Sequence, residues 1–246
     1  MPGAVSRVMA STVRRTALVL GLALPVSSWM IILAAVPQAS ACSDSNSSNH
    51  CYAIAENFNT NTNHGVYGEI NVHCLYQPNN GNQARAEIWD TSSGGTYWIE
   101  AGVISGVDYN GAYRNKAWVW ADQRPGFNYS EHDKAVTANT DTTYPTEIIF
   151  AGSGTWDVYG ENSFVLFGTS TNNSATLVEG MGGTEYEGGS ASGIRDIGDV
   201  YNLERRSSSN VWYSWGNNAQ DFDLGPGNYI NGHYVTGAHE YWNGPC

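Results

Sequence analysis

One carboxylate interrupts an otherwise apolar run, Tyr97–Val103, in this chain of 246 residues. Alternate side chains of an extended strand share a face, so Glu100 is expected on the face that carries Trp98, Gly102 and Ile104. The residues between them are apolar too, which predicts a strand covered on both sides and a desolvated Glu100. A buried carboxylate acquires a raised pKa or a partner. Such groups concentrate at functional sites, although a structural acid held by a backbone or Tyr partner has the same pattern.

A second acidic stretch, Ala175–Glu187, has a strand-like start, then glycines, then carboxylates. Glycines allow close backbone approach and unusual dihedral angles, which is useful where a substrate must come near. A bulge or hairpin that carries solvated acids is the plain alternative. Three glutamates are candidates for a second functional carboxylate: Glu179, Glu185 and Glu187.

The elements that must position these acids are strands. Short runs rich in Tyr, Trp, Val, Ile and Thr alternate with Gly, Asn, Ser and Asp clusters throughout residues 42–246. This pattern is typical of an all-β protein, and we expect an antiparallel two-sheet β-sandwich of the jelly-roll or concanavalin-like kind in a single domain. The polar segment Gln123–Tyr144 is expected to form a loop over one face.

The first 41 residues have the features of a secretory signal peptide. Three arginines precede an apolar run over 16–36, and Ala39-Ser40-Ala41 matches a small-x-small cleavage pattern. We therefore expect residues 1–41 to be removed and residues 42–246 to form a secreted, extracellular domain, without stable membrane association after cleavage.

Charge narrows the choice of partners. Residues 42–246 hold all 23 acidic residues but only eight basic ones, which gives a formal charge of −15. Nucleic acid and anionic membranes bind basic surfaces, so neither is expected as a partner. We expect a soluble monomer without a cofactor or a metal.

Four cysteines remain after residue 41, and an even number in an exported chain predicts two disulfides. Cys51 and Cys74 would face each other if residues 51–58 and 66–76 formed a hairpin around the polar turn at 59–65. Cys42 and Cys246 would then join the two ends of the domain.

The two acidic stretches also carry a family resemblance. Trp98-Ile99-Glu100-Ala101-Gly102 resembles the segment that bears the first catalytic Glu of neprosin-type glutamic peptidases, and Gly182-Gly183-Thr184-Glu185 resembles the region that bears the second. Met181 stands where that family has Trp, and Thr184 is an extra residue before the glutamate. The eqolisin peptidases share this sandwich architecture, with a Gln and a Glu as their dyad. The run at 120–125 also resembles uncharacterised secreted bacterial proteins.

This resemblance implies an acid-acting endopeptidase with a polypeptide substrate and the catalytic pair Glu100 and Glu185. Two carboxylates held close together share a proton over an acidic range. The ionised member would take a proton from the attacking water, and the protonated member would polarise the carbonyl and protonate the leaving amine. We assign Glu100 as the base and Glu185 as the acid. Aromatic side chains would line the substrate site: Trp98, Trp118, Trp120 and Tyr186.

A polysaccharide is the alternative partner, either for a two-carboxylate glycosidase or for a binding module without catalysis. Trp118, Trp120, Trp212 and Trp215 are candidates for a stacking platform, whereas Trp89, Trp98 and Trp156 are expected in the core. Glu131-His132-Asp133 is expected to be a solvated part of the polar loop. Asp122 and Arg124 are expected to form an ion pair that braces it.

Overall fold

A computed structural model describes residues 50–58, 63–72, 75, 81, 83–93, 95–171, 177–187, 198–215, 220–223, 230–234 and 237–240. All of these residues belong to one structural unit, which spans residues 37–246. They form strands and turns and contain no helix, so no described helix is long and apolar enough to cross a membrane. Residues 1–41 lie outside the described ranges, and the signal peptide therefore stays a prediction.

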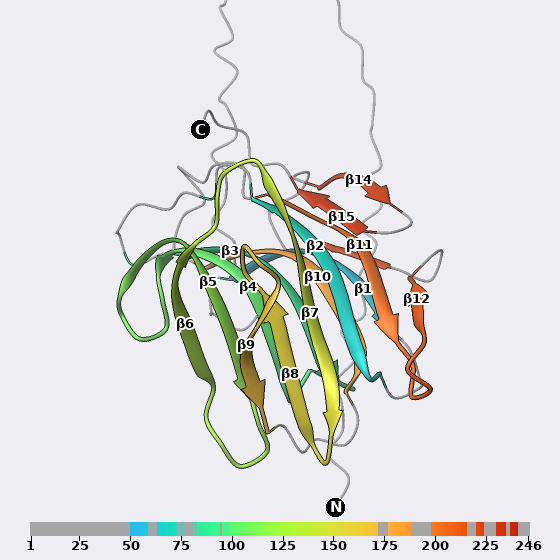
Figure 1. Cartoon of the computed structure of the whole chain (residues 1–246). Coiled ribbons are helices and arrows are strands. Elements are labelled where there is room, and N and C mark those ends of the chain that lie inside the picture. Colours follow the sequence, from blue (N-terminus) through green and yellow to red (C-terminus); the bar gives the residue numbers. More distant parts are fainter. Residues whose placement is uncertain are drawn as a thin grey trace, which may run out of the picture. The chain divides into compact units, whose positions relative to one another are not determined.

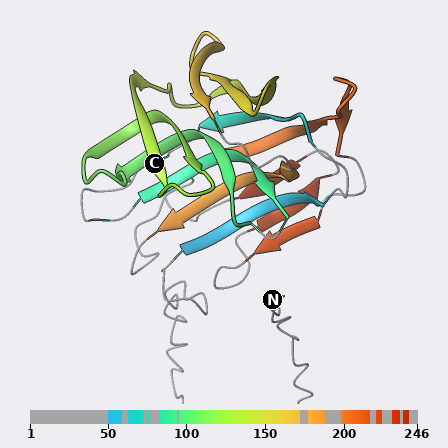
Figure 2. The same cartoon turned by 90° about the horizontal axis from the view of Figure 1, so that it is seen from below.

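The described strands form two antiparallel sheets (Figures 1 and 2). They are β1 (His50–Phe58), β2 (Gly65–Val72), β3 (Gln83–Ser92), β4 (Trp98–Val107), β5 (Tyr113–Gln123), β6 (Ser130–Thr137), β7 (Thr142–Gly152), β8 (Thr155–Gly160), β9 (Val165–Ser170), β10 (Leu177–Glu187), β11 (Gly198–Arg206), β12 (Trp212–Ser214), β13 (Gln220–Asp223), β14 (Ile230–Tyr234) and β15 (Gly237–Glu240).

Sheet A has the strand order β13-β1-β10-β3-β4-β5-β6, and sheet B has the order β14-β15-β11-β2-β7-β8-β9, with β12 paired to β11. The apolar core lies between them. Ile88 and Val103 of sheet A and Ile70, Ile148 and Leu203 of sheet B belong to one buried cluster. The all-β, antiparallel two-sheet sandwich in a single domain is thus confirmed.

The two sheets differ in how their outer faces are covered. In β2 of sheet B, buried and partly exposed residues alternate, as expected for a strand with one face on the core. In β3 of sheet A all ten residues are buried. Polar side chains on the outer face of β3 are therefore shielded from water, which is the setting in which charged groups interact most strongly.

The predicted loop over Gln123–Tyr144 is wrong. The structure places strand β6 at Ser130–Thr137, paired with β5 at the edge of sheet A, and begins β7 at Thr142. An edge strand tolerates charged side chains because only one of its sides must pair. The polar composition of this segment therefore did not exclude a strand.

The predicted hairpin of the first two strands is also wrong. β1 pairs with β10 and β13 in sheet A, whereas β2 pairs with β7 and β11 in sheet B. The Cys51–Cys74 disulfide rested on that hairpin. Cys42, Cys74 and Cys246, as well as the side chain of Cys51, lie outside what the structure describes, so both disulfides stay predictions.

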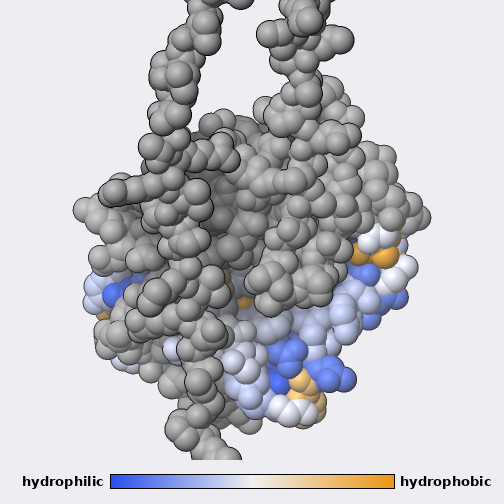
Figure 3. Space-filling view, turned by 180° about the vertical axis from the view of Figure 1, so that it is seen from behind, coloured by the Kyte–Doolittle hydropathy of each residue, from blue (hydrophilic) through white to orange (hydrophobic). Residues whose placement is uncertain are grey.

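The described part of the surface seen in Figure 3 is mainly hydrophilic, with a few small and separate hydrophobic spots.

A buried carboxyl cluster as candidate active site

The two predicted glutamates lie on the same face of sheet A. Ala84, Ala86 and Ile88 of β3 belong to the core cluster, so the residues between them face outward. Glu185 of β10 is opposite Arg85, and Glu100 of β4 is opposite Trp89. Directly paired residues share a face, so strand β3 carries the outward-facing residues between the two carboxyls.

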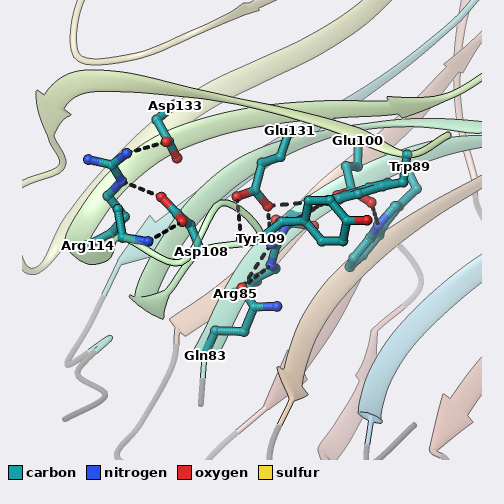
Figure 4. Close-up of polar contacts among 12 residues, drawn as sticks. Gln83, Arg85, Trp89, Glu100, Asp108, Tyr109, Arg114, Glu131 and Asp133 are labelled. Atoms are coloured by element: carbon teal, nitrogen blue, oxygen red, sulfur yellow. Dashed lines mark hydrogen bonds and ion pairs between the residues drawn. The ribbon is translucent and has the colours of Figure 1, made fainter. Parts of the chain in front are cut away.

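Arg85 is the cation at the centre of this face, and it is only 3% exposed. Its Nη1 atom donates to Glu87 Oε1 at 3.2 Å and to Glu100 Oε1 at 3.1 Å. Its Nη2 atom donates to Glu131 Oε2 and, at 2.9 Å, to Gln83 Oε1. Figure 4 shows Arg85 among Gln83, Glu100 and Glu131. One buried cation thus holds three carboxyls that come from strands β3, β4 and β6.

Glu100 is 5% exposed, and its carboxylate is surrounded by donors. Oε1 accepts from Arg85 Nη1 and from the hydroxyl of Tyr129. Oε2 accepts from Trp89 Nε1 at 3.1 Å and from Trp98 Nε1 at 2.9 Å. A carboxylate has about four acceptor positions, so these four donors fill it. Each of them favours the ionised form.

Burial and neighbouring negative charges act in the opposite direction. Burial raises the pKa of Glu100; Arg85 lowers it in part, and the charge of Glu185 raises it further. Burial raises the pKa of Glu87 well above its usual range, with Arg85 opposing and with Glu100 and Glu185 adding to the rise. Glu185 is itself 8% exposed. The charge of Glu185 therefore acts on both Glu87 and Glu100, and the ionisation of Glu100 disfavours that of Glu87.

Tyr129 connects two of the acids. Its hydroxyl donates to Glu100 and lies 3.2 Å from Glu131 Oε2. Its ring packs edge-on against Tyr109, with 4.9 Å between the ring centroids. Burial, and then the charge of Glu100, raises the pKa of Tyr129. The hydroxyl therefore stays protonated and can act as a donor.

A second group of acids adjoins the cluster (Figure 4). The ligand oxygens of Asp108, Glu131 and Asp133 all lie within 4.8 Å of one another, as in a potential cation site. Arg114 already pairs with Asp108 at 2.7 Å and with Asp133, and Glu131 is paired with Arg85. These contacts make the group a network of ion pairs.

The predicted aromatic contacts divide between the two faces of sheet A. Trp98 lies on the outer face, is partly exposed and donates to Glu100. Trp118 and Trp120 are opposite Val103 and Ala101 and belong to the core cluster, so they do not lie on the face of the carboxyls. Neither is kept as a substrate contact. Tyr186 follows Glu185 in β10, and its side chain lies outside what the structure describes.

The predicted tryptophan platform for sugars is not formed. Trp118, Trp120 and Trp215 are core residues. Trp212 packs edge-on against Tyr67 and under the guanidinium of Arg206, at the β11–β12 pair of sheet B. The four rings therefore share no surface. Of the three tryptophans regarded as possible core, Trp89 and Trp156 are buried and Trp98 is partly exposed.

Several residues of the cluster were missed by sequence reasoning. Arg85 and Glu87 alternate with apolar residues in β3, a period of two that marks them as sharing one face. Glu131 was set aside with the polar loop, yet it is 7% exposed and pairs with Arg85. The expected ion pair between Asp122 and Arg124 is present, with 3.3 Å between Oδ1 and Nε. The side chains of Glu179 and Glu187 lie outside what the structure describes.

The comparisons with known proteins show a similarity in fold and none in sequence family. No family model matches the chain, and no curated protein matches its sequence. Scytalido-glutamic peptidase bound to a peptide-based transition-state analogue is similar in structure, with a TM-score of 0.50 and 12% sequence identity over 78% of this chain and 98% of that one. The same peptidase bound to a transition-state analogue inhibitor gives the same values.

A third solved structure, SCP-B of the eqolisin family of peptidases in complex with the tripeptide Ala-Ile-His, has a TM-score of 0.48 at the same identity and coverage. At 12% identity a likeness of this kind concerns architecture rather than activity. The chain therefore has a β-sandwich fold similar to that of scytalido-glutamic peptidase.

Proposed function

We propose that this chain is a secreted endopeptidase of the glutamic type that acts at acidic pH through Glu100 and Glu185. One observation carries the proposal: two buried glutamates, 85 positions apart in the chain, lie on the same face of one sheet and interact electrostatically. The neprosin-like motifs around both residues and the similarity in fold to scytalido-glutamic peptidase support it.

In this proposal Glu100 is the ionised member of the pair. Four hydrogen-bond donors face its carboxylate, and hydrogen bonds to the charged form favour ionisation. Two of those donors belong to partly exposed residues, Trp98 and Tyr129. A water molecule held beside the substrate would displace one of these two donors from Glu100. The carboxylate oxygen that loses its donor would then accept a proton from this water.

Glu185 is the protonated member. Because Glu100 carries the negative charge, a second charge nearby is disfavoured, and the proton stays on the partner. The protonated carboxyl would polarise the peptide carbonyl as water attacks, and would then protonate the leaving amine. No cofactor takes part in these steps.

The substrate would be a polypeptide. Scytalido-glutamic peptidase has been solved with a peptide-based transition-state analogue, which makes a peptide the first ligand to test here. Trp98 would contact the substrate, since it is partly exposed and touches Glu100. The polysaccharide alternative has no comparable support, because the tryptophans expected to stack on sugars are mostly core residues.

The proposal is tested by digestion of a denatured protein between about pH 3 and pH 7. A pair of carboxyls that shares one proton is expected to be active within this range. Wild type is compared with Glu100→Gln and Glu185→Gln, with pepstatin present and absent. We expect pepstatin-insensitive cleavage by the wild type and its loss in both variants. Glu147→Gln, a change on β7 of sheet B, is the matched control and should remain active.

Cleavage that survives both substitutions would exclude the pair. A wild type that cuts no protein but is retained on insoluble glycans would favour the polysaccharide-binding alternative.

A further inference from the structure

Glu87 is a third acid in the cluster, and it is the most deeply buried of them, at 0% exposed. Its neighbours on the adjacent strands are glycines: Gly102 of β4 and Gly183 of β10 lie directly opposite it. A Cβ atom at Gly102 would lie only 2.6 Å from Glu87 Cγ. The absence of a side chain at Gly102 therefore leaves space that the Glu87 side chain needs.

The two oxygens of Glu87 have unequal surroundings. Oε1 accepts from Arg85 Nη1 at 3.2 Å. Oε2 is buried and has no hydrogen-bond partner within the described part of the chain. An ionised carboxylate would place negative charge on this unpartnered oxygen, and an unpartnered buried charge is far more costly than an unpartnered neutral group.

The charges that face Glu87 also oppose its ionisation. Glu100 of β4, Glu185 of β10 and Glu131 of β6 each add negative charge, and Arg85 is the cation that faces them. The hydroxyl of Tyr129 stays neutral, as its raised pKa shows. One buried positive charge cannot balance four carboxylates, so at least one carboxyl must hold a proton.

Arg85 Nη1 is the atom for which two acids compete. It lies 3.2 Å from Glu87 Oε1 and 3.1 Å from Glu100 Oε1. A neutral carboxyl attracts a guanidinium weakly, whereas an ionised one attracts it strongly. The protonation state of Glu87 therefore decides how much of the charge of Arg85 acts on Glu100.

We propose that Glu87 is a positioning residue that remains protonated when the site is active and thereby reserves Arg85 for Glu100. When Glu87 ionises at higher pH, it draws the guanidinium away from Glu100 and ends the active arrangement. Glu87 needs no contact with substrate, in keeping with its burial. The effect of Glu87 on activity rests on the proposed function, whereas the presence of a proton on Glu87 does not depend on it.

Glu87→Gln is the informative variant, because the amide has the same shape, stays neutral at every pH and still offers an oxygen to Arg85. We expect the alkaline limb of the pH profile of kcat/KM to move to higher pH by about one unit or more, the scale on which linked titrations separate. KM at acidic pH should be unchanged. Glu147→Gln serves as the control and should leave the limb in place. If Glu87 only fills space, the profile of Glu87→Gln will match that of the wild type, and the proposal is overturned.

Infrared spectroscopy of the protein with labelled glutamate locates the proton without any need for activity. Because the proposed function also places a proton on Glu185, the comparison includes Glu185→Gln. We expect a protonated carboxyl band at neutral pH that loses a component in Glu87→Gln and keeps this component in Glu100→Gln and in Glu185→Gln. A band that is unchanged in Glu87→Gln would overturn the assignment. A wild type with this band but no peptidase activity would contradict the proposed function and leave the proton on Glu87. A peptidase without the band would contradict the inference alone.

Discussion

Trp89 and Trp98 donate their indole N–H groups to the same oxygen of Glu100, at 3.1 and 2.9 Å. They reach it from adjacent strands, β3 and β4. An indole is a donor only, so it cannot exchange roles as a hydroxyl or a water can. This pair of donors fixes the orientation of the carboxylate and favours its charged form.

Removal of one indole donor should therefore shift the pH dependence of the site. In Trp98→Phe, the ionised form of Glu100 loses a charge-assisted hydrogen bond of roughly 1.5–3 kcal/mol. We expect the acidic limb of the pH profile of kcat/KM to shift to higher pH by about one unit, because Glu100 then ionises at higher pH. Trp156→Phe, a core change in sheet B, should lower stability without moving the limb. Equal profiles for the two variants would contradict the role of Trp98.

Arg85 should contribute far more to stability than Arg114. Arg85→Met leaves several buried carboxyls without their cation, and the loss of one partner of a buried ion pair costs about 3–5 kcal/mol. The side chain of Arg114 is 33% exposed and water can take its place beside Asp108, so Arg114→Met should cost less than Arg85→Met. Urea unfolding at pH 7 measures both. The loss in Arg85→Met should shrink at acidic pH, as the carboxyls protonate. Similar losses in the two variants would contradict a central role for Arg85.

The stability of the protein should fall as pH rises through the titration of Glu87. Burial raises the pKa of Glu87 in the folded state, so the folded protein binds more protons than the unfolded chain above the ordinary glutamate value of about 4.3. We expect Glu87→Gln to resemble wild type near pH 4 and to be more stable than wild type at pH 8. Thermal unfolding across this range measures it. Glu161→Gln, in the turn after β8, should follow the wild type. A Glu87→Gln variant that is less stable at pH 8 would show that the carboxylate is ionised and paired.

Gly102 should not tolerate a side chain. Its Cβ would lie 2.1 Å from the backbone oxygen of Ala86 and 2.6 Å from Glu87 Cγ. Because a backbone atom cannot yield as a side chain can, Gly102→Ala should cost about 3 kcal/mol or more. Gly182→Ala is the matched control, since its Cβ would meet chiefly the flexible end of Leu203. Denaturant unfolding should rank Gly102→Ala well below Gly182→Ala, and the reverse order would contradict the close packing around Glu87.

Much of the fold followed from local patterns. The turn clusters and β-branched runs predicted an antiparallel sandwich, and alternation placed Glu100 on the face that carries Trp98, as observed. Strand partners could not be predicted in the same way. β1 and β2 are neighbours in sequence, yet they lie in different sheets, because long-range packing of the two faces decides where a strand pairs.

The candidate site was only partly predictable for the same reason. Glu100 was visible as a charge within an apolar run, but its donors come from β3, β4 and the segment before β6. The segment around Glu131 has the polar composition of a solvated loop. Glu131 is buried only because β6 pairs with β5 and because Arg85 forms an ion pair with it. Trp118 and Trp120 were assigned to a surface by their residue type, whereas the pairing of β4 with β5 directs them into the core.

The central claim is that Glu100 and Glu185 act as one catalytic unit. Its most direct test is a comparison of kcat/KM for wild type, Glu100→Gln, Glu185→Gln and the double variant on one peptide substrate at acidic pH. Residues that act as a unit are not additive, so each single change should cost about 100-fold or more and the double variant should be no slower than the slower single variant. Losses that multiply in the double variant, or a single variant that retains full activity, would contradict the pair.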